Sequence, residues 1–253
     1  RVITNGAVTS RMTHHSPNMA QIPSVTAPYG KECRSFWCVP ENHKLVGIDA
    51  SGLELRMLAH YMQDPAYTEQ ILSGDIHTYN MKAAGLTNRN QSKTFIYAFL
   101  YGAGAAKIGQ IVGGGYKEGE VLIESFLRNT PALDKLRKRV SYFSEGGTLP
   151  ALDGRRLRVR SEHAALNTLL QGAGAIVMKQ ALVLLVESLE KYKIPYKLVA
   201  NVHDEFQIEV PENFAVTVGK AAVRAIRNAG EVLEMRCPLD GEYKIGNNWA
   251  ETH

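Results

Sequence analysis

The sequence predicts an α+β fold, with β-strands near both ends of the chain and helices between them. Two observations support this. The run HKLVGID at 43–49 reads as a strand, and KLVANV at 197–202 and EFQIEV at 205–210 read as two more, separated by only two residues. That separation is typical of a β-hairpin. Between the first strand and the hairpin, capping residues and helical patterns recur, so most of the central region is expected to be helical.

The helices are predicted in order from local signals. After the strand at 43–49, the run LELRMLAHYM at 53–62 has a helical pattern and stops at Asp64-Pro65. Proline disfavours helical geometry in the residue before it and cannot donate its own backbone hydrogen bond. A short helix is expected at 75–84 and a longer one at 90–101, which Gly102 and Gly104 terminate.

The second half of the chain contains three further helix signals. Thr130 is a good N-cap, and Pro131 suits the first helical position, so a basic helix is expected from there to about 145. Asp153-Gly154 marks a turn between two short extended pieces. One long helix is expected at 164–192 and a last one at about 214–229.

Composition limits the class of protein. A chain of 253 residues can bury a substantial core, and no uninterrupted apolar run approaches the ~18 residues needed to cross a bilayer. We therefore expect no membrane partner. The three cysteines, Cys33, Cys38 and Cys237, form no Cys-x-x-Cys pair. A disulfide framework or a zinc site is therefore not expected, and the cysteines and Met57, Met62 and Met178 are expected in the core.

Positive charge is concentrated in one segment. The net charge is +4, yet residues 128–160 carry nine Lys and Arg against three acidic residues. Such a segment is typical either of a solvated surface or of a contact with a nucleic-acid phosphate backbone.

Four residues in RNQSKTFIYAFLYGAG at 89–104 recur at a spacing of four: Arg89, Lys93, Tyr97 and Tyr101. On a helix they form one stripe of two cations followed by two aromatics. A guanidinium and an ammonium one turn apart suit adjacent phosphates of a triphosphate, and a tyrosine offers a flat surface to a base. The alternative interpretation is a solvated basic end that runs into an aromatic core.

Two aspartates lie at positions suited to metal binding. Asp49 ends the first predicted strand, and Asp204 lies at the tip of the hairpin. Carboxylates that meet on one sheet repel each other unless cations hold them, and oxygen ligands of this kind suit Mg²⁺. The hairpin tip His203-Asp204 also lacks the Asn-Gly or Asp-Gly that tight hairpins prefer, which is a departure typical of functional sites.

Three motifs in this order resemble those of DNA polymerase family A, the polymerase I type. VGIDASGLELRMLAHYM resembles motif A, RNQSKTFIYAFLYGAG resembles motif B, and NVHDEFQIEV resembles motif C. NGAVTSRMTHHSPNMAQIP is similar to the segment before motif A. GDIHT, HAALNTLLQGAGA and NWAETH are similar to the replicative polymerases of short-tailed phages in particular. The resemblance covers essentially the whole chain.

The resemblance implies a right-hand fold with an antiparallel palm sheet, flanking helices and inserted helical fingers. It places the palm at 1–63 and 163–253, with motif C in the hairpin 197–210, and the fingers at 64–162, with motif B in the helix 90–101. The thumb and exonuclease domains of the family have no counterpart in this chain. We therefore expect an N-terminal portion elsewhere as a partner.

The implied activity is template-directed DNA synthesis, which adds deoxynucleoside triphosphates to a primer in phage genome replication, in the cytoplasm of the infected bacterial cell. The implied partners are primer-template DNA and dNTPs. The implied cofactor is a pair of Mg²⁺ ions, with Mn²⁺ as a substitute. A processivity factor cannot be read from this chain. The site residues fall into three groups: Asp49, Asp204 and the Ala50 carbonyl for the metals, with Lys93 catalytic; His77, Arg89, Lys93, Tyr97 and Glu54 for the nucleotide; and Arg11, Tyr101, Asn167, Gln171, His203 and Glu205 for template and primer.

Alternatives remain at individual positions and for the whole chain. His77 could be a surface residue, Glu54 could pair with a helix neighbour, and Asn167 and Gln171, one turn apart, could bond each other. A single-subunit RNA polymerase shares the aspartates and the cations, but typically has Met at the position of Tyr97 and lacks Glu54. A second alternative is a nucleic-acid-binding fragment without turnover.

Overall fold

The computed structural model describes residues 1–253, and the chain divides into two compact units. We call Arg1–Leu53 together with Gly172–His253 the sheet unit, and Glu54–Gln171 the helical unit. The sequence predicted boundaries at 63/64 and 162/163, whereas the structural boundaries fall at 53/54 and 171/172. Helix α2 (Leu53–Met62) accordingly belongs almost entirely to the helical unit.

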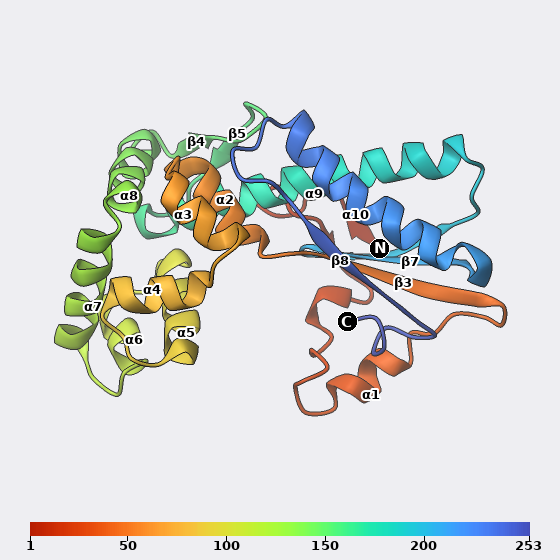
Figure 1. The fold of residues 1–253 in the computed structure, drawn as a ribbon, viewed down its shortest axis with the longest axis horizontal. Helices are drawn as coiled ribbons and strands as arrows, with labels where there is room; N and C mark the ends of the chain where they lie inside the picture. Colours follow the sequence, from red (N-terminus) through yellow and green to blue (C-terminus); the bar gives the residue numbers. More distant parts are fainter. The chain divides into compact units, whose positions relative to one another are not determined.

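The sheet unit is built on a four-stranded antiparallel sheet in the order β6-β7-β3-β8 (Figure 1). The predicted strand and hairpin form as expected. The strands are β3 (His43–Ala50), β6 (Lys197–Val202), β7 (Glu205–Pro211) and β8 (Gly241–Gly246). Strand β8 was not predicted, although GEYKIG alternates between more and less exposed residues as an edge strand does.

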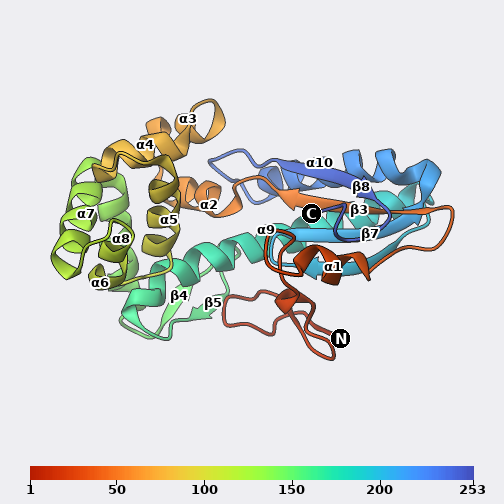
Figure 2. The same cartoon turned by 90° about the horizontal axis from the view of Figure 1, so that it is seen from below.

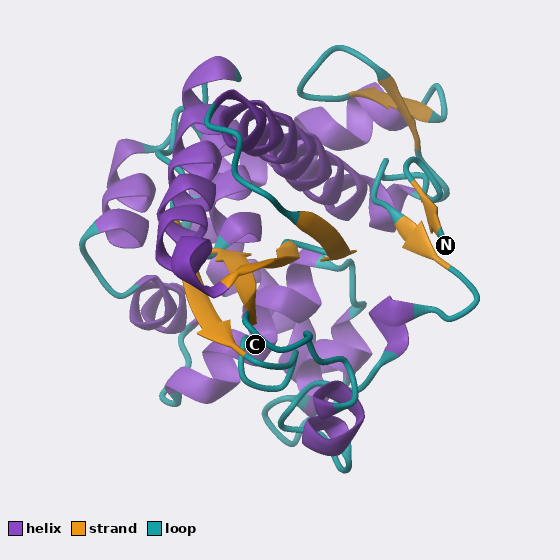
Figure 3. Ribbon diagram, turned by 90° about the vertical axis from the view of Figure 1, so that its right-hand side faces the viewer, coloured by secondary structure: helices purple, strands orange, loops and turns teal.

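Two helices and a loop-rich segment flank this sheet. Helix α10 (Ala215–Val232) packs on β3, β7 and β8, and α1 (Gly30–Ser35) lies on the opposite side (Figure 2). On that second side Leu45, Val202 and Trp249 form a small buried cluster. The C-terminus lies beside the strands (Figure 3). The N-terminal segment adds β1 (Val2–Ile3), β2 (Thr13–His14) and a 3-10 turn at Met19–Gln21.

Helix α9 (Ala165–Lys191) is the longest in the chain and runs from the helical unit into the sheet unit. By length and composition alone it is apolar enough to cross a membrane, but 61% of the apolar window is buried within the protein. Polar Asn167, Gln171 and Lys179 interrupt its apolar runs. A buried core helix of a globular protein has the same length and composition.

The helical unit is held together by aromatic packing. Phe95 and Phe99 of α5 both meet Phe126 of α7 edge-on, with ring centroids 5.2 and 5.4 Å apart. Such edge-to-face pairs add to the gain from burying apolar surface. Besides α2, the unit contains α3 (Pro65–Leu72), α4 (Ile76–Ala84), α5 (Arg89–Leu100), α6 (Ala105–Gln110), α7 (Tyr116–Asn129), α8 (Pro131–Ser144) and the hairpin β4 (Thr148–Pro150) and β5 (Arg156–Arg158).

Two local expectations were wrong. Thr130 does precede α8, but its side chain makes no cap; the hydroxyl instead donates back to the Phe126 carbonyl at the end of α7. The short junction between two consecutive helices leaves that carbonyl as the nearer partner. Cys38 is exposed and Cys33 half-buried, so only Cys237 of the three cysteines lies in the core.

Candidate active site

Carboxylates gather at one end of the sheet unit's strands. Asp49, near the end of β3, is directly opposite Glu205 on β7 and Glu242 on β8. Directly opposed residues of antiparallel strands point to the same face. The backbone N–H of Ala50 donates to the carbonyl of Asp204 at 3.1 Å, which joins the end of β3 to the hairpin turn. The sheet therefore brings together the two predicted aspartates, which are separated by more than 150 residues in sequence.

The hairpin turn that carries Asp204 has an unusual backbone. His203, its first residue, has a φ of 57°, in the left-handed region that favours glycine. A non-glycine residue there costs conformational energy, and such residues cluster at functional sites. The sequence already showed that this turn lacks the usual residues. The structure shows that His203 takes the strained conformation and is exposed beside Asp204.

The electrostatics around Asp49 are unfavourable for its charged form. Incomplete hydration raises the pKa of the Asp49 carboxyl to about 7, and the negative charges of Asp204 and Glu205 add to this rise. His253 acts in the opposite direction, and Glu242 raises the pKa slightly. A site in which carboxylates repel one another is one that a cation would stabilise.

Glu205 is held in a different way from Asp49. It is 4% exposed and accepts hydrogen bonds from Trp249 Nε1 at 2.6 Å, from the Gln207 side-chain amide, and from a ring nitrogen of His253 at 2.7 Å. Burial alone would raise its pKa, but these donors outweigh burial and hold the pKa below its usual value. Glu205 is therefore a structural anchor within the carboxylate group.

The C-terminal segment supplies two of the three side chains that donate hydrogen bonds to Glu205. Trp249 and His253 bond Glu205, and the Thr252 hydroxyl donates to Gln207 on the same strand at 2.8 Å. On the far side of Trp249, the guanidinium of buried Arg34 stacks over the indole at 4.2 Å. Sequence reasoning missed these residues. The only signal in the sequence was the family-like NWAETH ending, which gave no indication of partners.

The residues at this end of the strands fit a hard cation, such as Mg²⁺, that keeps part of its water shell. No three His, Cys, Asp or Glu side chains in the chain are grouped to enclose a metal ion by themselves. Asp49 and Asp204, with the Ala50 carbonyl, would supply only oxygen ligands, and Mg²⁺ characteristically combines one or two carboxylates with water and substrate phosphates. The repulsion of Asp49 by Asp204 and Glu205, which raises the pKa of Asp49, also favours a cation at this position.

The predicted stripe in the helical unit lies along the exposed side of α5. Arg89, Lys93 and Tyr101 are exposed and Tyr97 is half-buried, whereas Phe95, Ile96, Phe99 and Leu100 are buried. Asn88 begins the helix and accepts from the backbone N–H groups of Asn90 and Gln91 at 2.9 and 3.2 Å. The solvent-exposed side of α5 thus carries the two cations and Tyr101, with the half-buried Tyr97 between them.

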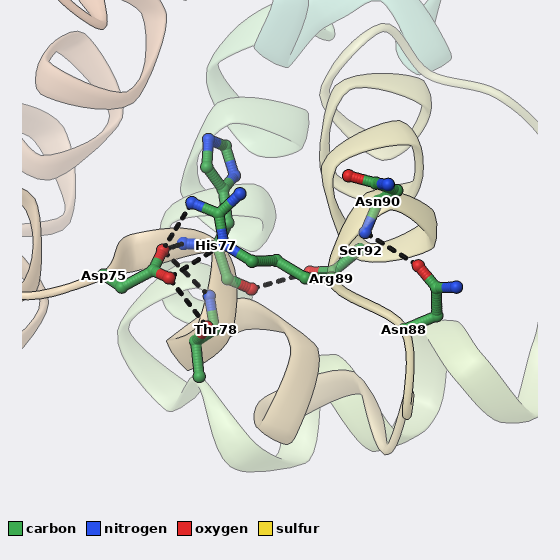
Figure 4. A network of polar contacts seen from close by, with 7 residues as sticks. All are labelled: Asp75, His77, Thr78, Asn88, Arg89, Asn90 and Ser92. Atoms are coloured by element: carbon green, nitrogen blue, oxygen red, sulfur yellow. Dashed lines mark hydrogen bonds and ion pairs between the residues drawn. The ribbon is translucent and has the colours of Figure 1, made fainter.

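Arg89 makes an ion pair that the sequence did not predict (Figure 4). Its Nε and Nη2 donate to the two oxygens of Asp75 at 2.8 and 3.0 Å. His77 follows two residues later, at the start of α4, and Ser92 of α5 donates to its carbonyl at 3.0 Å. Incomplete hydration lowers the pKa of His77, and the charges of Arg89 and Lys93 lower it further. The His77 ring thus loses its proton more readily than an ordinary histidine.

Glu54 and Tyr101 form a second connection in the helical unit. The Tyr101 hydroxyl donates to Glu54 Oε1 at 2.8 Å. This joins the start of α2 to the end of α5. The expectation paired Glu54 with Tyr97, and that packing stays a prediction.

The remaining predicted residues are divided between the two units. Arg11, His203 and Glu205 belong to the sheet unit together with Asp49, Ala50 and Asp204; Asn167 and Gln171 on α9 belong to the helical unit, as do the residues of the stripe, His77 and Glu54. Each unit thus carries its own set of the predicted residues. The sheet unit collects carboxylates, and the helical unit collects cations and aromatic rings.

Comparison with known proteins identifies relatives across the whole chain. Residues 1–251 match the model of DNA polymerase family A. The chain is 45% identical to the DNA-directed DNA polymerase of Enterobacteria phage T3 and 44% identical to that of Escherichia phage T7, each over 98% of this chain. It spans 40% of the length of these two relatives.

The fold also matches a solved structure. The POL domain of Pol1 from M. smegmatis, in complex with DNA primer-template and dNTP, superimposes with a TM-score of 0.89 over 99% of this chain and 48% of that one. At 23% identity this likeness bears on the fold alone. It confirms the predicted α+β class with a polymerase palm and inserted helices.

Proposed function

We propose that this chain, which belongs to DNA polymerase family A, performs template-directed DNA synthesis, adding deoxynucleoside triphosphates to the 3′ end of a primer. The observation that carries the proposal is that the Ala50–Asp204 backbone bond joins Asp49 and Asp204 where the central strands of the sheet end. We further propose that the protein serves phage genome replication in the cytoplasm of an infected bacterium, because two relatives that match 98% of this chain are phage polymerases.

In this proposal the sheet unit acts as the palm. Asp49, Asp204 and the Ala50 carbonyl would hold two Mg²⁺ ions, or Mn²⁺ in their place. Such ions, when bound, activate the attacking primer oxygen and stabilise the leaving pyrophosphate. Glu205, already fully hydrogen-bonded, would keep the hairpin in position and would not be an essential ligand. His203 and Arg11 would contact the primer side.

The helical unit would act as the fingers. Arg89 and Lys93 would bind the triphosphate by charge-assisted hydrogen bonds, with His77 beside them. Tyr97 would stack on the incoming nucleotide and Tyr101 would lie at the templating position, while Glu54 would exclude a ribose 2′-hydroxyl. Asn167 and Gln171 would test the shape of the new pair in the minor groove, where acceptors are common to all correct pairs. The basic segment 128–160 would contact template phosphates.

Primer extension is the decisive experiment. The chain is incubated with primer-template and Mg²⁺ and given dNTPs, rNTPs or no nucleotide. Extension with dNTPs alone supports the proposal, and equal extension with rNTPs indicates an RNA polymerase instead. Binding of DNA without extension, in a preparation that also fails when the N-terminal portion of a relative is added, indicates a non-catalytic binding fragment.

The grip on DNA provides a second test. The chain spans 40% of its relatives' length, so we propose that an N-terminal thumb and exonuclease portion is its partner. Without it, contacts with DNA are mostly to phosphates, whose affinity falls steeply with salt. In a trap-challenged assay the chain should dissociate after very few additions, and binding should drop sharply between about 50 and 200 mM salt.

A further inference from the structure

Asp75 and Arg89 form a geometrically fixed pair in the helical unit. Asp75 is the N-cap of α4: its Oδ1 accepts from the backbone N–H groups of His77 and Thr78 at 3.1 and 3.3 Å, and its Oδ2 accepts from the Thr78 hydroxyl at 2.8 Å. The same two oxygens accept from Arg89 at 2.8 and 3.0 Å (Figure 4). The helix cap therefore fixes the carboxylate, and the carboxylate fixes the guanidinium.

The pair leaves one side of the guanidinium available. Arginine has five N–H donors in a planar fork. Asp75 engages the side formed by Nε and Nη2. The other side, formed by Nη1 and the second N–H of Nη2, makes no hydrogen bond, and the Arg89 side chain is 52% exposed. Those donors have the spacing that binds two oxygens of a phosphate.

The surroundings of this free side suit an anion. Lys93 lies one helical turn further along α5 and is exposed. The charges of Arg89 and Lys93, together with incomplete hydration, lower the pKa of His77, whose Nδ1 is buried without a hydrogen-bond partner. The Ser92 hydroxyl of α5 donates to the His77 backbone carbonyl at 3.0 Å, which ties the start of α4 to α5.

Stability does not explain the pair. Both side chains are about half exposed, and exposed ion pairs contribute little to folding. The comparable pair of Lys138 and Asp134 lies on one helix and fixes nothing else. The Asp75 pair instead restricts a long side chain, and restricting a side chain before a ligand arrives reduces the entropy lost on binding.

We infer that Asp75 is a positioning residue for nucleotide binding: it holds Arg89 by the Nε side and presents the Nη side to the triphosphate. This rests on the proposed function, in which Arg89 contacts the incoming nucleotide. In the opposite role, the Asp75 carboxylate would compete with the phosphates for the N–H groups of Arg89 and so weaken nucleotide binding. The two roles differ in the sign of the effect when Asp75 is replaced.

The test measures binding of dATP with Mg²⁺, and of inorganic tripolyphosphate, to the full chain by calorimetry. Asp75→Asn keeps an N-cap oxygen, since Asn caps as well as Asp, but presents an amide where Nε–H needs an acceptor. Asp64→Asn is the matched control: Asp64 caps α3 through the same Oδ1 bonds, at 2.9 and 3.2 Å, with no arginine on it. Arg89→Ala reports on the proposed function itself, and Arg89→Lys removes the fork.

We expect Asp75→Asn to lower the affinity for both ligands about 3- to 10-fold, which corresponds to the entropy lost when one long side chain has to be ordered on binding. Asp64→Asn should leave both affinities unchanged. In the Arg89→Lys background the Asp75→Asn change should have no further effect, because an ammonium has no second side to orient. In primer extension the loss should appear in KM more than in kcat.

Four results would overturn the inference, and a fifth would overturn the proposed function on which it rests. Tighter binding by Asp75→Asn would show that the carboxylate competes with phosphate. Equal weakening by Asp64→Asn, or an undiminished effect in the Arg89→Lys background, would show a general effect on helix caps. If Arg89→Ala itself leaves both ligands unaffected, the nucleotide assignment in the proposed function fails first. If Arg89→Ala lowers the affinity and Asp75→Asn does not, the positioning role of Asp75 is rejected while the proposed function stands.

Discussion

The sheet unit and the helical unit handle charge in opposite ways. In the sheet unit, strand register sets Asp49 beside Glu205 and Glu242. Incomplete hydration raises the pKa of Asp49 to about 7, and the charges of Asp204 and Glu205 add to this rise. In the helical unit the principal cation, Arg89, has its own carboxylate on a helix cap. Around Asp49 the sheet unit brings together charges mostly of one sign, whereas at Arg89 the helical unit places opposite charges in contact.

The two units differ in what fixes the positions of their charged side chains. At the ends of the strands, the carboxylates are positioned by backbone hydrogen bonds of the sheet, which a side-chain substitution leaves intact. A helix stripe depends on caps and ion pairs that single substitutions remove. Substitutions in the sheet unit should therefore affect chemistry strongly and geometry little, whereas those in the helical unit should produce graded effects on binding.

The largest effect is expected at the aspartates. Asp49→Asn or Asp204→Asn should reduce nucleotide incorporation roughly a thousandfold or more, because each carboxylate would position metals that stabilise the transition state more than the ground state. Single-turnover primer extension measures this, with duplex binding as the control. Incorporation within about tenfold of the unmodified chain would reject the two-metal assignment.

The same aspartate should be unfavourable to folding when no metal is bound. The pKa of Asp49 is raised to about 7 in the folded chain, so the unfolded chain loses this proton at lower pH, and the group lowers stability as pH rises from about 4 to 7. With a chelator present, Asp49→Asn should raise Tm more at pH 8 than at pH 5. Glu231→Gln, on the exposed surface of α10, controls for loss of one charge. A pH-independent difference would contradict this account of the site.

The buried anchor should matter to stability. Trp249→Phe removes the indole N–H from Glu205, a carboxylate that is 4% exposed, and should lower the free energy of unfolding by about 1–3 kcal/mol. Denaturant unfolding measures the loss. The matched control is Trp37→Phe, at a tryptophan that is 42% exposed, with a change expected within about 0.5 kcal/mol. Equal losses would mean that ring volume matters and the hydrogen bond does not.

Sugar selection tests the connection between α2 and α5. Glu54→Ala should raise the use of rNTPs relative to dNTPs by roughly tenfold, because it opens the space proposed to exclude the 2′-hydroxyl. Tyr101→Phe is the control, since it removes only the hydroxyl that donates to Glu54 at 2.8 Å. The ratio of single-nucleotide incorporation rates decides. If Tyr101→Phe shifts the ratio as far as Glu54→Ala, the hydrogen bond sets selectivity and not the occupied space.

The smallest effect is expected at the cap of α5. Asn88→Ala should lower the free energy of unfolding by about 1 kcal/mol, because two backbone N–H groups lose their acceptor. Asn90→Ala, two residues later, is the control for losing an amide side chain from this segment. Thermal unfolding of both variants measures the difference. Equal stability of the two would show that water replaces the cap at no cost.

Much of the fold was predictable because its signals are local. The strand ending at Asp49, the hairpin with the unusual His203-Asp204 tip, and the helix starting after Asp75 all have their determinants within a few residues. Helix α3 was not predicted, because Asp64-Pro65 was interpreted only as the end of the preceding helix. Strand β8 escaped prediction, because an edge strand of six residues has a weak pattern of its own and forms by pairing with β3. The Thr130 cap was wrong for a similar reason: α7 ends where α8 begins and supplies a competing acceptor.

The sequence by itself determined the α+β class, the order of the three polymerase motifs and the stripe of Arg89, Lys93, Tyr97 and Tyr101 on one helix face. These follow from spacing along the chain, since backbone periodicity converts spacing directly into direction. Only the tertiary structure decided which residues meet across long separations. The register that sets Glu205 and Glu242 opposite Asp49, the grip of the C-terminal segment on Glu205, and the pairing of Asp75 with Arg89 depend on how distant strands and helices pack. No local pattern encodes that choice, because each partner has several chemically suitable alternatives in the chain until packing brings one of them within hydrogen-bonding distance.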